Sequence, residues 1–278
     1  MTDHDANNST LTLSDGATLA YTRHEVPHAG APRLVLIHSL ALDRTVWDAV
    51  VAELEGEMEI LTYDCRGHGR SDRRAAPYTT DLFAKDLAQL LDHVGWKTTA
   101  VAGCSMGGCV ALAFAGLFPS RVTALGLIDT TAWYGADAPA KFKERADAAR
   151  AKGMSALFGF QSTRWFSDEF RTSHPDVLTR TLEVFVANDL ECYAATCDLL
   201  GTADVRTYLS SFRMPVAVVV GEEDYATPVE MAQRLHDAIP QSTLTVLARA
   251  RHLTPIEHPG AIASELRVLI GRAGEERS

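Results

Sequence analysis

Positively charged side chains are scarce in this sequence of 278 residues. Lys and Arg total 26 against 36 Asp and Glu, so the formal net charge is −10 at pH 7. A chain with this balance repels phosphate backbones and anionic lipid surfaces. We therefore expect neither a nucleic-acid partner nor a membrane partner.

The sequence also lacks the spacings that hold metals and nucleotides. It has no Cys-x-x-Cys pair, no His-Glu-x-x-His, no calcium-binding loop and no Gly-Lys followed by Ser or Thr. The glycine-rich run Arg66–Ser71 lacks the third glycine of a dinucleotide-binding loop. Five cysteines, an odd number in a chain of this length, do not indicate a disulfide framework. We predict no metal and no cofactor.

Secretory and membrane signals are missing as well. The first residues, MTDHDANNST, are polar and acidic, unlike the basic and then apolar pattern of a secretory signal. The stretch 98–120 carries no charge, which is long enough to raise the question of a membrane span. Gly103, Gly107 and Gly108 interrupt it, and its two halves read as a strand and a helix. We expect a buried strand, turn and helix, in a cytoplasmic protein.

What the sequence does contain is a regular alternation of strand-like and helix-like segments. Asp15-Gly16 indicates a hairpin turn between Leu11–Leu13 and Leu19–Tyr21. Helical spacing of apolar residues occurs around 46–54 and 83–94, in 110–117, and from about Pro228 and Pro259. The expected buried strands are 34–37, 60–63, 100–103, 122–128, 216–220 and 244–247. This order predicts an α/β fold with a mainly parallel sheet covered by helices on both faces.

The rhythm breaks between about Thr131 and Phe212, where no clear strand pattern occurs. This stretch holds 12 of the 21 aromatic residues of the chain. We expect a helical insertion that lies on the sheet. The predicted organisation is a core of residues 1–130 and 213–278 with a helical cap at 131–212.

A candidate nucleophile follows one of the predicted strands. Gly103-Cys104-Ser105-Met106-Gly107 matches the Gly-x-Ser-x-Gly pattern, and it stands between a strand end and a helix start. Small residues on either side of Ser105 allow a tight turn from which the hydroxyl projects. The start of the following helix favours negative charge that develops beside the serine.

A serine hydroxyl needs a base, and the base needs an orienting carboxylate. His252 follows the 244–247 strand, and Asp224 follows the 216–220 strand, so both are expected at the edge of the sheet where Ser105 lies. The chain order of serine, aspartate and histidine is the one used on this architecture. Rivals for the two roles are His258, Glu222, Glu223 and Asp129.

Stabilisation of an oxyanion requires two backbone N–H donors. Met106 directly follows the candidate nucleophile and is expected to supply one. The loop after the 34–37 strand is expected to supply the other, and by analogy with related loops we choose Leu40.

With these motifs in place, nearly the whole chain resembles the α/β-hydrolase superfamily, and within it the 3-oxoadipate enol-lactone hydrolases. The resemblance rests on His38-Ser39-Leu40 with Trp47, the run 63–71, the serine turn, and the segments 118–122 and 224–228. In the insertion it rests on Thr130-Thr131-Ala132, Arg145, Trp165-Phe166 and Tyr193-Ala194-Ala195 followed by Asp204. His38 and Ala41 depart from it, because asparagine and glycine are expected there.

The resemblance implies a mostly parallel, eight-stranded sheet with a helical cap, and a carboxylic ester hydrolase active in the catabolism of aromatic compounds. The substrate would be a small lactone, with 3-oxoadipate enol-lactone or a related carboxylated lactone as the first hypothesis. The residues expected to bind it are His38, Ser39, Trp133, Arg145 and Trp165. The alternatives are a general carboxylesterase, a γ-lactamase or a cofactor-free haloperoxidase or perhydrolase with the same triad, and a non-catalytic ligand receptor.

Residues 141–152 carry five basic and two acidic side chains, in contrast to the acidic chain as a whole. They are interpreted either as a patch that binds a substrate carboxylate or as a solvated helix face, and the resemblance favours the first role for Arg145. The oligomeric state is left open.

Overall fold

A computed structural model describes residues 8–28 and 30–275 of the chain. Its strands form one sheet of eight in the order β1-β2-β4-β3-β5-β6-β7-β8. The strands are β1 (Asn8–Thr12), β2 (Thr18–His24), β3 (Arg33–Ile37), β4 (Glu59–Tyr63), β5 (Thr99–Cys104), β6 (Val122–Ile128), β7 (Val216–Gly221) and β8 (Ser242–Leu247). The β1–β2 and β2–β4 pairs are antiparallel, and the remaining pairs are parallel.

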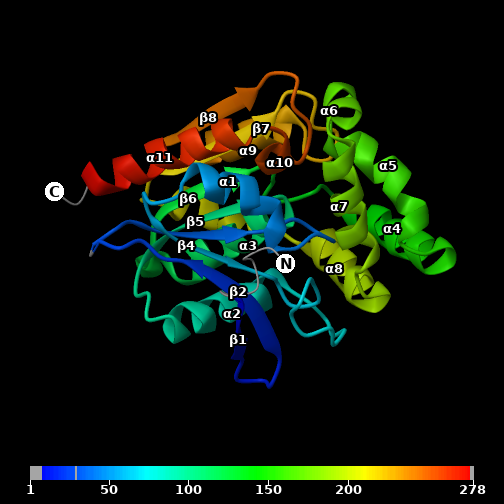
Figure 1. Cartoon of the computed structure of the whole chain (residues 1–278), viewed down its shortest axis with the longest axis horizontal. Coiled ribbons are helices and arrows are strands. Elements are labelled where there is room, and N and C mark those ends of the chain that lie inside the picture. Colours follow the sequence, from blue (N-terminus) through cyan, green and yellow to red (C-terminus); the bar gives the residue numbers. More distant parts are fainter. Residues whose placement is uncertain (1–7, 29, 276–278) are drawn as a thin grey trace.

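Helices connect the strands and cover the sheet. They are α1 (Asp48–Glu53), α2 (Thr80–His93), α3 (Met106–Leu117), α4 (Ala138–Lys152), α5 (Ser155–Trp165), α6 (Asp168–Ser173), α7 (Pro175–Val186), α8 (Leu190–Thr202), α9 (Val229–Ala238), α10 (Thr254–Glu257) and α11 (Pro259–Glu275). One face carries α1 packed on α11, and the other carries α2 packed on α3 (Figure 1). The predicted fold class is confirmed.

The strands buried on both faces are the ones with continuous apolar sequences. All six residues of β5 and all six of β7 are buried, as expected for parallel strands between two layers of helices. The α2 helix instead buries one stripe, which includes Phe83, Leu87 and Leu90, and leaves its other face to solvent. The core therefore lies on both sides of the sheet.

Five helices, α4 to α8, lie together on one side of the molecule between β6 and β7 in the chain (Figure 1). Within this group α4 packs along α8, and α5 packs on α7. The antiparallel bridge between Trp133 and Asp204 joins the two ends of the group. The stretch 131–212 contains no named strand, in keeping with its lack of a strand pattern.

The parallel strands end at one edge of the sheet, and the chemically active candidates follow those ends. Ile37 of β3 pairs with Gly103 of β5, and Cys104 of β5 pairs with Ile128 of β6. The loops after β3, β5, β7 and β8 therefore meet where an open α/β sheet binds its ligands.

Candidate active site

Ser105 is the single residue between β5 and α3. Its backbone has φ 55° and ψ −115°, a conformation that costs energy for a residue with a side chain. The turn leaves no room for a side chain at Gly103 or at Gly107. A Cβ at Gly103 would lie 2.1 Å from the Gly107 carbonyl oxygen, and a Cβ at Gly107 would lie 2.2 Å from that of Ile37. These glycines allow β3, β5 and α3 to approach closely, and the approach holds Ser105 in its strained position.

Three predicted side chains meet at this turn in a continuous hydrogen-bonded row. The Oγ atom of Ser105 lies 2.9 Å from Nε2 of His252, and Nδ1 of His252 lies 2.8 Å from Oδ2 of Asp224. All three residues are buried. The other carboxylate oxygen of Asp224 accepts hydrogen bonds from the backbone N–H groups of Ala226 and Thr227, at 2.7 and 2.9 Å. These bonds fix the carboxylate so that it can orient the imidazole ring.

The rival acids and the rival histidine lie elsewhere. Asp129 is fully buried, but its carboxylate accepts hydrogen bonds from Gly221 and Thr254. Burial and the nearby Asp224 carboxylate raise the pKa of Asp129 well above its ordinary value. Glu222 accepts a hydrogen bond from the Arg249 backbone, Glu223 pairs with Arg251, and the half-buried His258 directly precedes α11.

Two backbone N–H groups are available beside the nucleophile. Those of Leu40 and Met106 donate no hydrogen bond to any other residue within 8–28 and 30–275. Leu40 lines the cavity above Ser105, while Met106 is buried as the first residue of α3. The loop that carries Leu40 continues into Ala41, whose φ of 60° is in the region that favours glycine, the residue that the resemblance leads us to expect there.

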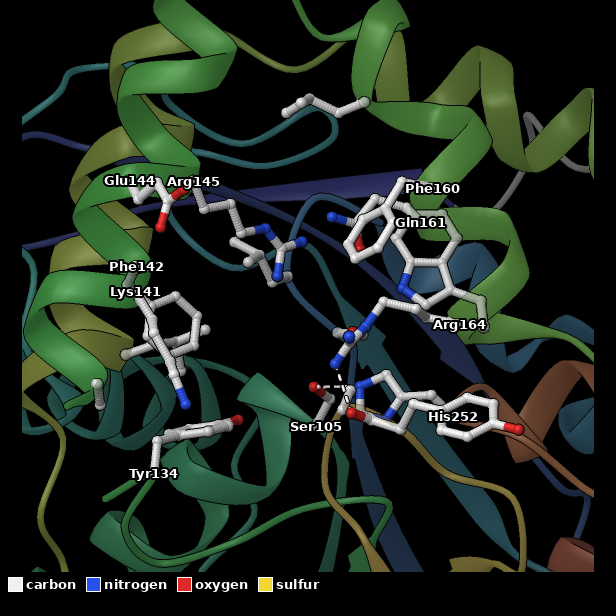
Figure 2. A pocket seen from close by; sticks show the side chains of 18 of the residues that line it. Ser105, Tyr134, Lys141, Phe142, Glu144, Arg145, Phe160, Gln161, Arg164 and His252 are labelled. Carbon is white, nitrogen blue, oxygen red and sulfur yellow. Dashed lines mark hydrogen bonds between the residues drawn. The ribbon is translucent and has the colours of Figure 1, made fainter. Parts of the chain in front are cut away.

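A cavity of about 590 Å³ opens over Ser105 and His252 (Figure 2). Of the residues predicted to bind substrate, Ser39, Arg145 and Trp165 line it. Most of its wall is apolar and comes from α4, α5 and α8. The apolar and aromatic lining residues include Tyr134, Phe142, Leu157, Phe160, Trp165, Leu200 and Tyr225.

His38 and Trp133, also predicted to bind substrate, do not line this cavity. His38 is fully buried. Its Nδ1 lies 2.8 Å from the Ser39 carbonyl oxygen, and its Nε2 accepts a hydrogen bond from the Cys65 backbone N–H. Burial lowers the pKa of His38, so the ring acts as a neutral brace between two loops. The ring of Trp133 lies against the Arg206 guanidinium, 4.0 Å from its carbon.

Two guanidinium groups reach into the cavity from opposite walls (Figure 2). Arg145 donates to the Tyr193 hydroxyl at 2.6 Å, and Arg164 donates to the Tyr225 carbonyl oxygen. Within the described residues, neither forms an ion pair with a carboxylate. Burial, together with repulsion from Arg145, lowers the pKa of Arg164. Glu144 also lines the cavity, but its side chain is exposed, and the two guanidinium groups have no ion-pair partner among the described residues.

The other basic residues of 141–152 differ from Arg145. Lys143 pairs with Asp147, and Arg150 pairs with Glu191 on α8. Lys141 lines the cavity but pairs with Asp137, and Lys152 is exposed. The side chains of Lys143, Arg150 and Lys152 therefore form a solvated helix face.

Sequence reasoning missed several residues of the cavity wall. They include Arg164, a second cation, and Tyr134, whose hydroxyl points toward Ser105 (Figure 2). Burial raises the pKa of Tyr134 well above its ordinary value, so the hydroxyl stays protonated. A concentration of aromatic residues in 131–212 was the available signal, but it does not say which of them face the cavity.

Among residues 8–28 and 30–275, no three His, Cys, Asp or Glu side chains are grouped so as to hold a metal ion. All five cysteines are buried and free. No helix in these two ranges has the length and apolar character needed to cross a membrane.

Comparison with known proteins gives consistent matches along the chain. The model of the alpha/beta hydrolase fold family matches residues 32–259. A 3-oxoadipate enol-lactonase of Acinetobacter baylyi is 31% identical over 95% of this chain and 96% of its own length. The crystal structure of the enol-lactonase from Burkholderia xenovorans superposes with a TM-score of 0.90 at 31% identity, covering 95% of this chain and 100% of that one.

A thermophilic esterase from Thermogutta terrifontis, solved with malate bound, also superposes closely. Its TM-score is 0.88 at 28% identity, and the match covers 96% of this chain and 99% of that one. The two lactonases and the esterase thus match at least 95% of this chain. The chain belongs to the alpha/beta hydrolase fold family and is an enzyme of the carboxylic ester hydrolase class.

Proposed function

We propose that this enzyme opens a small lactone that carries a carboxylate, with 3-oxoadipate enol-lactone as the first candidate. The observation behind this assignment is the pair of guanidinium groups, Arg145 and Arg164, that share the cavity with Ser105. Both side chains are half-buried, so each loses part of its hydration without gaining a carboxylate partner, and an anionic ligand offsets that cost. The similarity to enol-lactonases supports the choice of ring.

In the first step Ser105 attacks the lactone carbonyl carbon. His252 is 2.9 Å from the hydroxyl oxygen and takes its proton, while Asp224 stabilises the imidazolium that forms. The carbonyl oxygen becomes an oxyanion, which accepts hydrogen bonds from the backbone N–H groups of Leu40 and Met106.

In the second step the bond between the former carbonyl carbon and the ring oxygen breaks. His252 returns its proton to the ring oxygen, which leaves as an enol and then tautomerises to a ketone. The acyl group stays bound to Ser105. A water molecule, deprotonated by His252, attacks the acyl carbon and releases the free acid, and the proton on His252 restores the serine hydroxyl.

Arg145 and Arg164 would bind the substrate carboxylate and hold the ring over Ser105. Both belong to the stretch 131–212, which we assign as a cap that selects the substrate, while 1–130 and 213–278 carry the reacting groups. Trp165 and the apolar wall would enclose the ring and exclude water.

The test compares 3-oxoadipate enol-lactone with α-angelica lactone, which has the same ring with a methyl group in place of the carboxymethyl group. We expect a kcat/KM for the carboxylated lactone at least about tenfold higher, since charge-assisted hydrogen bonds contribute roughly 1.5–3 kcal/mol. Replacing Arg145 or Arg164 by Gln should raise KM for the carboxylated lactone alone. Equal kcat/KM values for the two lactones in the unaltered enzyme would rule the assignment out.

A general carboxylesterase is the second candidate. It is favoured by the largely apolar and aromatic wall of the cavity, which also suits the acyl or aryl group of a neutral ester. Aryl esters hydrolysed much faster than either lactone would identify this function.

A further inference from the structure

Two segments that lie far apart in the sequence are fastened together beside the active site. One is the segment 163–168, which runs from the last turn of α5 to the first residue of α6, and the other is the stretch 251–257 that begins just before His252. The Leu253 backbone N–H donates to the Trp165 carbonyl oxygen at 3.1 Å. Glu257 accepts hydrogen bonds from the backbone N–H groups of Ser167 and Arg251, each at 2.9 Å.

The side chain of Arg251 forms the centre of this connection. Its Nη1 atom donates to the carbonyl oxygens of Thr163 and Phe166, at 2.8 and 3.0 Å, and lies 3.0 Å from an oxygen of Asp168. Its Nε atom lies 3.4 Å from an oxygen of Glu223. Only 11% of the Arg251 side chain is exposed, so the guanidinium group that joins the two segments is largely shielded from solvent.

The hydrogen bonds from Arg251 satisfy backbone carbonyl groups at the C-terminal end of α5. The last carbonyl groups of a helix have no partner within the helix, and a cation near them also counters the negative end of the helix dipole. Arg251 supplies both donors and charge to the last turn of α5. Without it, this turn loses partners for the Thr163 and Phe166 carbonyl oxygens, and we expect the turn to loosen.

That same turn carries two residues of the cavity wall, Arg164 and Trp165. Arg164 donates to the Tyr225 carbonyl oxygen, and the Arg251 guanidinium lies 5.3 Å from the centre of the Tyr225 ring. Arg164, which would bind the substrate, and His252, which would act as base, are therefore both held in place by the contacts of Arg251.

We propose that Arg251 is a positioning residue that fixes Arg164 relative to His252 and so sets the preference for carboxylated substrates. This inference rests on the proposed role of Arg164. Arg251 does not line the cavity, and it acts by keeping the position of Arg164 constant relative to His252.

The experiment uses two esters with the same leaving group, mono-4-nitrophenyl glutarate and 4-nitrophenyl butyrate. The measured quantity is the ratio of kcat/KM for the charged ester to that for the neutral ester. We expect Arg251→Met to lower this ratio about tenfold, the equivalent of about 1.4 kcal/mol. Arg251→Lys keeps one cationic donor and should restore part of the ratio.

Arg267→Met is the matched control. Arg267 also donates to a backbone carbonyl oxygen, that of Glu53, and pairs with a carboxylate, that of Glu57, but it joins α11 to the α1 region and does not line the cavity. This variant should keep the wild-type ratio. Amide hydrogen exchange should become faster in 155–166 in Arg251→Met and not in Arg267→Met.

The possible outcomes distinguish failure of the proposed function from failure of the proposed role of Arg251. If the wild-type enzyme shows no preference for the charged ester, both the proposed function and the role of Arg251 fail. If the wild type prefers it and Arg251→Met, folded by circular dichroism, keeps the full preference, only the role of Arg251 fails. Should Arg251→Met not fold, Asp168→Asn weakens one partner of Arg251 and must lower the ratio in the same direction.

Discussion

The side-chain amide of Asn188 donates a hydrogen bond to the Ala41 carbonyl oxygen over 2.7 Å. This contact joins the turn between α7 and α8 to the loop that carries Leu40, a predicted oxyanion donor. The same amide nitrogen also bonds to the carbonyl oxygens of Val184 and Phe185 at the end of α7. The helical segment thus touches the reacting side of the sheet at a second point.

We expect Asn188→Ala to lower kcat about tenfold, or about 1.4 kcal/mol of activation free energy, because the Leu40 N–H loses a fixed position. KM should change little, since no cavity residue is removed. Thr202→Val is the control: among residues 8–28 and 30–275 the Thr202 hydroxyl donates only to carbonyl groups of its own helix, α8, so kcat should stay unaltered. An equal loss of kcat in both variants would refute the role of the Ala41 contact.

Substitutions in and beside the proposed triad should show that Asp224, and not the nearby Asp129, orients His252. We expect Ser105→Ala to abolish turnover, and Asp224→Asn to lower kcat by about four orders of magnitude through the wrong histidine tautomer. Asp129→Asn changes a buried carboxylate whose hydrogen bonds in the described structure go to Gly221 and Thr254, so its main effect should be on stability. Single-turnover kinetics and circular dichroism check both; the opposite ranking of the two aspartates would reassign the orienting acid.

Acid should destabilise the protein through His68. Burial, with a smaller electrostatic contribution from His38, lowers the pKa of His68 to about 3. A histidine in the unfolded chain has a pKa of about 6.5. The unfolded state therefore binds more protons between these values, and the free energy of unfolding falls as pH decreases through this window. The contribution is roughly 2 kcal/mol between about pH 7 and pH 5.

Urea unfolding of the wild type and of His68→Asn at several pH values measures this contribution. Asn can still donate to the Arg66 carbonyl oxygen, which His68 Nδ1 contacts at 3.0 Å, but it does not titrate. The variant should show a shallower loss of stability on acidification. Parallel curves for the two proteins would contradict the assignment.

Glycine replacements should have opposite effects at two positions. Gly107→Ala places a Cβ 2.2 Å from the Ile37 carbonyl oxygen, so we expect a loss of more than about 3 kcal/mol or no folded protein. Gly271→Ala lies inside α11 with open space around the new methyl group, and it should gain about 0.5–1 kcal/mol. Thermal unfolding of both variants checks the pair.

Much of the core could be predicted because its signals are local. The apolar run 122–128 coincides with β6, and the expected strand 216–220 falls one residue short of β7. The small residues around Ser105 identify a tight turn because only glycine fits there, and α3 begins at Met106 rather than at 110 as expected. The short helix α10, at 254–257, has no periodic pattern and was not predicted.

The cavity wall was harder to predict because its members are defined by what they face. Arg164 on α5 and Arg150 on α4 look alike in the sequence, yet one enters the cavity and the other pairs with Glu191 at the surface. Only the tertiary packing of α4, α5 and α8 separates a substrate-facing cation from a solvated one. His38 shows the reverse case: it stands next to the predicted oxyanion loop, but both ring nitrogens contact backbone groups.

The helical segment between β6 and β7 is joined at its two ends by the antiparallel bridge between Trp133 and Asp204. Its two ends therefore start from adjacent points, and the block can be lengthened, shortened or exchanged between related enzymes without breaking a strand pairing. A graft of this kind carries its own requirements. The recipient must offer an Arg251 equivalent for the end of α5 and a free carbonyl group for Asn188, or the transplanted wall will sit out of line with the nucleophile.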